Sequence, residues 1–135
     1  MIPLEWTVEY STGIPKIDSQ HAYLFELANR LARALASGRS DEVLANIVQE
    51  LNEYVNTHFA YEESVMQQAH YDSFVQHQAM HKKMREQLAE YVVQLQNKTL
   101  SAQALSKFLE VWLTEHILHE DMAYIPAVAA SGYQP

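Results

Sequence analysis

The sequence predicts an all-α protein, folded as an up-down-up-down four-helix bundle with an extended N-terminal arm. The 135-residue chain holds only 3 glycines and 4 prolines and lacks long alternating runs of β-branched residues, which favours helices joined by short turns. Four segments repeat apolar residues at helical spacing, and capping or turn residues separate these segments. Short connections place consecutive helices side by side around one apolar core. We therefore expect a single domain spanning 1–135.

The first element is the predicted arm at 1–17, where prolines and a glycine interrupt any regular pattern. No helix is expected within it. Asp18 or Ser19 is predicted to cap the first helix, because a short polar side chain can accept hydrogen bonds from the first free amides. Gly38 is predicted to end this helix, since glycine tolerates the left-handed conformation common after a last turn.

Three more helices follow, and each begins near a serine that can act as a cap: Ser40, Ser73 and Ser101. The second helix is expected to end near Ala69 and the third near Leu95. Pro126 limits the fourth helix, because proline lacks the amide hydrogen that a helix interior needs. The bundle should therefore occupy 18–125 and leave a C-terminal tail at 126–135.

Composition narrows the range of functions. The 17 acidic residues exceed the 9 basic ones, and no stripe of lysine and arginine could follow a phosphate backbone, which argues against nucleic acid as a partner. With no cysteine, any metal must be held by nitrogen and oxygen atoms. The N-terminus lacks the features of a secretory signal, and no stretch is apolar enough to enter a membrane. We expect a cytoplasmic protein without membrane insertion.

Ligand-type side chains lie on the apolar faces of all four predicted helices: His21, His58, Glu62, His77, His81 and His116. His58 and Glu62 are four residues apart, so they share one helical face. A single histidine on such a face is usually a hydrogen-bonded core residue. Five imidazoles buried at one level of a bundle would be costly without metal. The pattern therefore predicts a metal site.

Asp121 completes this set only if the fourth helix changes its geometry. It follows His116 by five positions, which is about 140° around an ideal helix. Both side chains can face one site if the helix widens or unwinds between them. We therefore predict a π-bulge or an unwound turn near Leu118.

Four neighbouring residues are predicted to lie outside the site. Glu63 and Glu120 are adjacent to predicted ligands but point about 100° away on an ideal helix, so they should be solvated. His70 and His119 should be surface residues or support the ligands from outside.

Five imidazoles and two carboxylates exceed what one ion with four ligands can use, so two metals sharing the carboxylates fit better. Imidazole suits iron, copper, nickel and zinc, whereas bridging carboxylates with terminal nitrogens favour a di-iron centre. The chain has no Glu-x-x-His pair typical of ferritin-like bundles. Metalloprotease, serine-hydrolase and P-loop patterns are also missing from the sequence.

At these residues the sequence closely resembles the hemerythrin family, in particular its single-domain bacterial members. The matching segments are Ile17-Asp18-Ser19-Gln20-His21, His58-Phe59-x-x-Glu62-Glu63, His77-x-x-x-His81 and His116-Ile117-x-x-x-Asp121. The resemblance extends from the arm to Asp121, and every ligand position holds the residue type of the family.

The resemblance implies an asymmetric centre of two iron ions joined by a solvent-derived oxygen atom. One iron would take His77, His81 and His116, the other would take His21 and His58, and Glu62 and Asp121 would bridge them. The iron with two histidines would keep a vacant position for dioxygen. The residues expected around this vacancy are apolar: Leu24, Phe59, Trp112, Leu113 and Ile117.

The function that this resemblance implies is reversible dioxygen binding for storage, transport or delivery, by a protein that is not an enzyme. An apolar wall would deny protons and water to bound oxygen, which favours binding over oxidation chemistry. An oxygen-consuming enzyme would be the recipient. The alternatives are a di-iron oxidase, a peroxidase or a nitric oxide-handling enzyme, and an oxygen-sensing or iron-buffering module.

Overall fold

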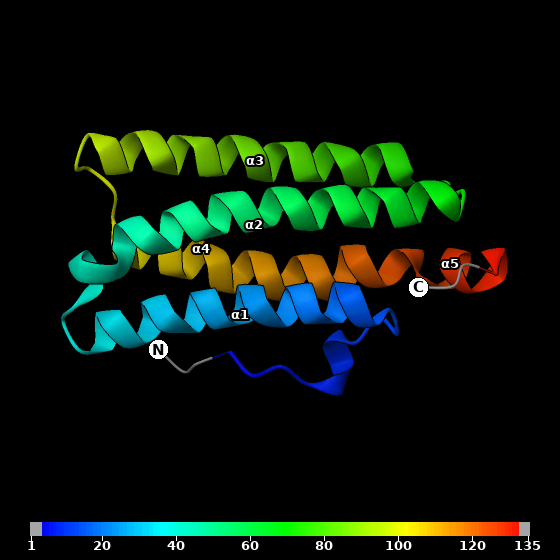
Figure 1. Cartoon of the computed structure of the whole chain (residues 1–135), viewed down its shortest axis with the longest axis horizontal. Helices are drawn as coiled ribbons and strands as arrows, with labels where there is room; N and C mark the ends of the chain where they lie inside the picture. The colour runs from blue at the N-terminus through cyan, green and yellow to red at the C-terminus, as the bar shows by residue number, and fades with distance from the viewer. Residues whose placement is uncertain (1–3, 133–135) are drawn as a thin grey trace.

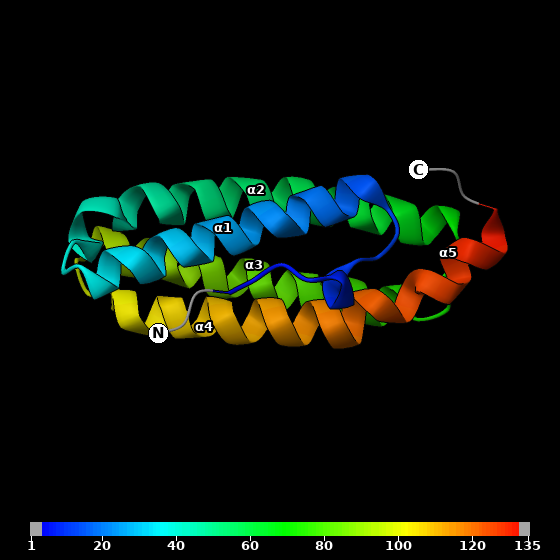
Figure 2. The same ribbon diagram turned by 90° about the horizontal axis from the view of Figure 1, so that it is seen from below.

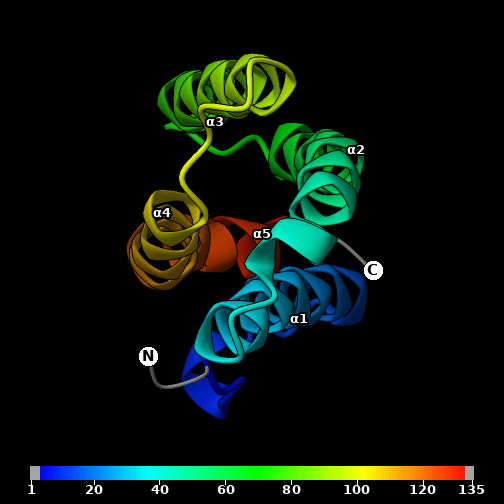
Figure 3. The same ribbon diagram turned by 90° about the vertical axis from the view of Figure 1, so that its left-hand side faces the viewer.

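The computed structural model describes residues 4–132, which form four long helices and no strand. The helices are α1 (Pro15–Ala36), α2 (Ser40–Gln68), α3 (Phe74–Gln96) and α4 (Ala102–Glu115). Consecutive helices run in opposite directions, and α1 packs against both α2 and α4 while α3 packs against α2 (Figures 1 and 3). The predicted up-down-up-down bundle is confirmed.

The N-terminal arm lies along the outside of the bundle, as predicted, but it contains one short 3₁₀ helix, η1 (Val8–Tyr10) (Figure 2). Residues 1–3 of the predicted arm lie outside the described residues. Asn29 of α1 holds the arm at Leu4. Its Oδ1 atom accepts from the amide of Leu4 at 2.6 Å, and its Nδ2 atom donates to the carbonyl of Leu4 at 2.7 Å. The expectation that the arm holds no helix is wrong for this one turn.

The predicted start of the first helix is also wrong, because α1 begins at Pro15, three residues before Asp18. Proline is well suited to a first helical position, where its missing amide hydrogen would have no partner anyway. Asp18 has a different role. Its carboxylate accepts from Ser11 Oγ at 2.8 Å, from Thr12 N at 2.7 Å and from Thr12 Oγ1 at 2.8 Å. Asp18 therefore ties the arm to α1.

Of the three serines predicted to cap helices, only Ser101 makes a capping hydrogen bond with its side chain. Ser101 caps α4 as expected, since its side chain accepts from the amide of Ala104 at 3.1 Å. Ser40 is the first residue of α2 instead of its cap, and Ser73 occupies the cap position of α3 without a side-chain capping bond. Gly38 follows α1 with a φ of +71°, which confirms the predicted helix end.

The fourth helix ends in an irregular region made of three short elements: the π-helix η2 (His116–Asp121), the 3₁₀ helix η3 (Met122–Tyr124) and α5 (Ile125–Ser131). The widened turn predicted near Leu118 is confirmed. The predicted tail is wrong where it is described, because α5 is helical and buries Val128. Pro126 lies in the first turn of α5, where proline is tolerated. Residues 133–135 of the predicted tail lie outside the described residues.

Two apolar clusters fill the interior. The larger one joins all four long helices through residues such as Leu31, Leu51 and Leu109, and the smaller one lies where α2 meets α5. Along α2, Glu62 is placed between Phe59 of the larger cluster and Val65 of the smaller one. The polar site therefore occupies a level between two apolar regions. No helix within 4–132 is long and apolar enough to cross a membrane.

Candidate metal centre

All of the residues predicted as metal ligands lie together in one buried cluster, and none is more than 5% exposed: His21, His58, Glu62, His77, His81, His116 and Asp121. They come from α1, α2, α3 and the π-helix η2. Helical spacing explains the pairs within α2 and within α3, because residues four apart share a face. The wider π-turn brings the last pair onto one side.

Glu62 points one carboxylate oxygen toward each side of the cluster. Its Oε1 atom lies 2.9 Å from His81 Nε2 and 3.2 Å from His77 Nε2. Its Oε2 atom lies 3.7 Å from His21 Nε2 and 3.8 Å from His58 Nε2.

Asp121 divides its oxygens in the same way. Its Oδ1 atom lies 2.9 Å from His116 Nε2 and 3.0 Å from His77 Nε2, and its Oδ2 atom lies 3.0 Å from His21 Nε2. The cluster thus contains two overlapping groups, and within each group ligand atoms lie within 4.8 Å of one another. We call them the three-histidine group (His77, His81, His116) and the two-histidine group (His21, His58). Both groups share Glu62 and Asp121.

Outer hydrogen bonds determine which nitrogen of two histidines carries the proton. His58 Nδ1 lies 2.7 Å from Gln20 Oε1, and His81 Nδ1 lies 2.8 Å from Glu63 Oε2. Because these oxygens can only accept, each Nδ1 must donate, which leaves a lone pair on each Nε2 atom. Both lone pairs face the shared carboxylates.

Several of these inner atoms have no hydrogen-bond partner among residues 4–132: Nε2 of His21, His58, His81 and His116, and both oxygens of Asp121. Some of these nitrogen and oxygen atoms lie about 3 Å apart, but their geometry is not that of a hydrogen bond. Atoms about 2.1 Å from one ion and at right angles around it are about 3 Å apart, which is the spacing of the shorter nitrogen–oxygen contacts here. The donor atoms therefore fit cations, and buried lone pairs without a cation would be costly.

The charges of the cluster also depend on burial and pairing. Burial alone would lower the pKa of His21 and of His77, but the adjacent carboxylates of Asp121 and Glu62 favour the protonated imidazoles and raise each pKa to about 9. Burial lowers the pKa of His58 to about 4. Although burial opposes ionisation of Glu62, the surrounding histidines hold its pKa well below the usual value. Without metal, protons on His21 and His77 thus balance the two carboxylates.

The prediction that Glu63 is solvated is wrong. Besides His81, its carboxylate accepts from Arg85 Nη2 at 3.1 Å and from Gln78 Nε2 at 3.1 Å, and its side chain is 13% exposed. Burial would raise the pKa of Glu63, but these donors lower it. The spacing along α2 could not reveal this, because the partners belong to α3.

Two further buried residues contact ligands without having been predicted. Tyr124 is fully buried, and its hydroxyl donates to Glu62 Oε2 at 3.0 Å. Gln20 lies one residue before His21 but contacts His58. Gln20 belongs to a segment that matches the hemerythrins, whereas no pattern in the sequence pointed to Tyr124.

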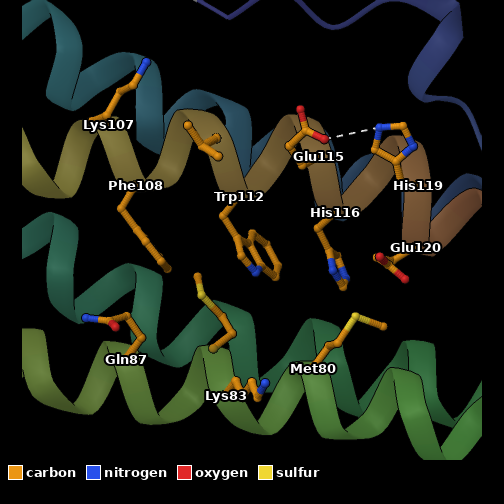
Figure 4. Close-up of a pocket in the computed structure, with 12 residues that line it drawn as sticks. Met80, Lys83, Gln87, Lys107, Phe108, Trp112, Glu115, His116, His119 and Glu120 are labelled. Carbon is orange, nitrogen blue, oxygen red and sulfur yellow. Dashed lines mark ion pairs between the residues drawn. The ribbon is translucent and has the colours of Figure 1, made fainter.

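The residues expected outside the cluster do lie outside it. His70 is exposed, and His119 pairs with Glu115 on the surface at 3.2 Å. Glu120 is partly buried at a groove of about 730 Å³ between α3 and α4 (Figure 4), so it is less solvated than expected.

Of the apolar residues expected around a vacancy, Phe59 and Trp112 contact ligand histidines. Leu24, Phe59, Leu113 and Ile117 are buried, whereas Trp112 is partly exposed in the groove. Phe59 stacks on His81 with ring centroids 3.8 Å apart. Trp112 stacks on His116 with ring centroids 4.5 Å apart, and Figure 4 shows this second pair. These two aromatic rings therefore contact the three-histidine group. Their role as a pocket wall stays a prediction.

Comparison with known proteins identifies the family. A family model described as the hemerythrin HHE cation binding domain matches residues 12–128. The chain belongs to the hemerythrin family. It is 34% identical over 131 residues to a bacteriohemerythrin of Pseudomonas aeruginosa, covering 97% of this chain and 85% of that protein. It is 32% identical over 136 residues to a bacteriohemerythrin of Methylococcus capsulatus, covering 96% of this chain and all of that protein (100%).

A solved structure of wild-type hemerythrin has the same fold, with a TM-score of 0.85, 29% identity and coverage of 95% of this chain and 99% of that chain. The predicted resemblance to hemerythrins is confirmed. Because the hemerythrin family model describes a cation-binding domain, the buried histidine and carboxylate cluster is the part of this chain that fits a cation.

Proposed function

We propose that this hemerythrin-family protein binds dioxygen reversibly at two iron ions, for storage, transport or delivery. One observation carries the proposal: Glu62 and Asp121 each present one oxygen to either side of the cluster, as carboxylates bridging two ions would. The three-histidine group would hold one iron, and the two-histidine group would hold the other. Imidazole and carboxylate together are suitable ligands for iron.

The two sides offer unequal numbers of ligands. His21 and His58 supply two nitrogens on one side, and the three-histidine group supplies three on the other. A small molecule would therefore find room on the side of His21 and His58. When bound there, the iron pair would supply the electrons that dioxygen takes up and returns.

The protein's contribution to reversibility is to exclude water and protons. Leu24, Phe59, Leu113 and Ile117 are each at most 1% exposed, and none of them carries an acidic proton. The nearby hydroxyl proton of Tyr124 is engaged by Glu62. Such surroundings slow protonation of bound oxygen and favour its release unchanged.

The direct test is to load the metal-free protein with ferrous iron under argon and measure the iron content and the visible spectrum. The expected result is about two irons per chain and a spectrum that appears in air, bleaches under argon and returns in air. A single ion per chain, a preference for zinc over iron, or a spectrum that never reverses would overturn the proposal.

A di-iron oxidase, a peroxidase or a nitric oxide-handling enzyme is the second candidate, and the groove between α3 and α4 favours it. This groove reaches His116 and Trp112, so it offers small molecules an approach to the three-histidine group (Figure 4). Rapid turnover of peroxide or nitric oxide with an added reductant, measured on the iron-loaded protein, would support the enzyme over the oxygen carrier.

A further inference from the structure

The two sides of the proposed metal site have different outer partners. On the three-histidine side, His81 donates to the carboxylate of Glu63. On the other side, His58 donates to the neutral amide oxygen of Gln20. The outer nitrogen of His21, Nδ1, is buried without a hydrogen-bond partner among residues 4–132. The three histidines therefore differ at their outer nitrogens: His81 faces an anionic acceptor, His58 faces a neutral acceptor and His21 has none.

Glu63 is held firmly in this position. Arg85 Nη2 donates to the same oxygen that faces His81, and Gln78 Nε2 donates to the other oxygen. The guanidinium of Arg85 also lies 5.3 Å from the ring centroid of Phe59, and this ring stacks on His81. The ring of His81 is thus fixed by Glu63 at its outer nitrogen and by Phe59 on its face.

A carboxylate that accepts from the outer nitrogen of an imidazole makes the inner nitrogen a stronger donor to metal, and a neutral amide does so less. We propose that Glu63 is a positioning residue that makes the three-histidine side hold its ion more tightly than the other side, and favours the higher oxidation state there. Two ions would therefore bind in order, with the three-histidine side first. This inference rests on the proposed paired metal site.

A purely structural role for Glu63 would have different consequences. The same contacts join α2 to α3, so their loss could lower the stability of the bundle without changing either metal position. Glu63→Gln separates the two roles, because glutamine keeps the size and an acceptor oxygen but removes the charge.

The experiment titrates the metal-free protein with Co²⁺ under argon, with a competing chelator, and follows visible absorption. The wild-type chain should bind two ions in separate steps. Glu63→Gln should weaken the tighter step by roughly 10- to 100-fold and leave the weaker step nearly unchanged. Glu53→Gln is the matched control, since Glu53 is an exposed carboxylate on the same helix, and it should change neither step.

A second readout is the reduction potential of the iron-loaded protein, which Glu63→Gln should raise because a charge that favours ferric iron is lost.

The converse variant, Gln20→Glu, places a carboxylate on His58 and should tighten the weaker step. A tighter step cannot result from unfolding, so this variant is decisive even if Glu63→Gln folds poorly.

The outcomes distinguish the two proposals. If the wild-type chain binds no pair of ions, the proposed function fails. If it binds two ions but Glu63→Gln keeps both affinities and the potential, or Gln20→Glu fails to tighten the weaker step, only the role of Glu63 is overturned.

Discussion

Glu62 and Asp121 are both fully buried, come from α2 and from the π-helix η2, and each direct one oxygen to either histidine group. Two buried carboxylates so close together would destabilise a fold unless positive charge lay between or beside them. In the metal-free protein, this charge comes from protonated histidines. In the proposed loaded protein, it would come from the metal ions.

Replacing Glu62 by alanine should abolish the paired site. The change removes an oxygen from both sides at once, so we expect iron content to fall from about two ions per chain to at most one, with loss of the oxygenated spectrum. Most helix content should remain, because both apolar clusters are intact. Iron analysis and far-ultraviolet circular dichroism measure the two effects. Glu53→Ala is the control, and a retained iron pair in Glu62→Ala would exclude a bridging role.

Metal uptake should release protons and strengthen as pH rises from 6.5 toward 9. His21 and His77 have pKa values of about 9, so both carry protons at neutral pH that must leave before their nitrogens bind metal. Calorimetry in buffers with different heats of ionisation should show about two protons released per metal pair near pH 7.5. Uptake without proton release would contradict the assignment of these histidines as ligands.

The metal-free protein should be most stable near pH 6.5. The pKa values of His21 and His77 are raised on folding, so the stability that they contribute is full below about pH 6.5 and is lost as pH rises through 9. The pKa of His58 is lowered to about 4, so stability also falls as pH drops from 6.5 toward 4. Thermal unfolding with and without metal tests this, because only the metal-free protein should lose stability between pH 6.5 and 9.

Tyr124→Phe should destabilise the protein through Glu62. The variant keeps the ring but removes the hydroxyl that donates to a buried carboxylate, and such a bond contributes about 1.5–3 kcal/mol to the free energy of unfolding. Urea denaturation of the metal-free protein measures the loss. Tyr71→Phe is the matched control, since Tyr71 packs edge-on against Tyr124 and its substitution leaves the bond to Glu62 in place. Equal effects of both variants would contradict the prediction.

Asp18→Ala should release the N-terminal arm. Asp18 accepts three hydrogen bonds from Ser11 and Thr12, so its loss leaves the arm held by Asn29 and by packing. We expect faster cleavage of the arm in limited proteolysis, with the bundle itself still resistant. Asp41→Ala removes an exposed carboxylate from α2 and should leave the cleavage rate unchanged.

The sequence was most informative where helical geometry alone decides the outcome. His58 and Glu62 had to share a face at a separation of four, and His116 and Asp121 could share one only through a widened turn, which η2 provides. The sequence was least informative where contacts between helices decide. Glu63 points away from the cluster on α2, but α3 brings His81 and Arg85 to that side.

The ends of elements were also hard to predict, because competing local signals are similar in strength. Asp18 resembles a cap, but Pro15 starts α1 and Asp18 binds the arm. Pro126 resembles a helix terminator, but it is the second residue of α5, which begins at Ile125 directly after η3. In both cases proline lies in the first turn of a helix. The sequence alone does not show whether such a proline ends one helix or begins the next.

Because an open groove separates α3 from α4, metal ions at the proposed site would help to hold α3 in the bundle. α3 packs against α2 and borders α4 across this groove, yet it supplies His77 and His81. Ions bound there would act as a cross-link between α3, α1 and the end of α4, much as a disulfide joins distant segments. Backbone amides of α3 should therefore exchange with deuterium faster than those of α1 in the metal-free protein, and loading should slow α3 most.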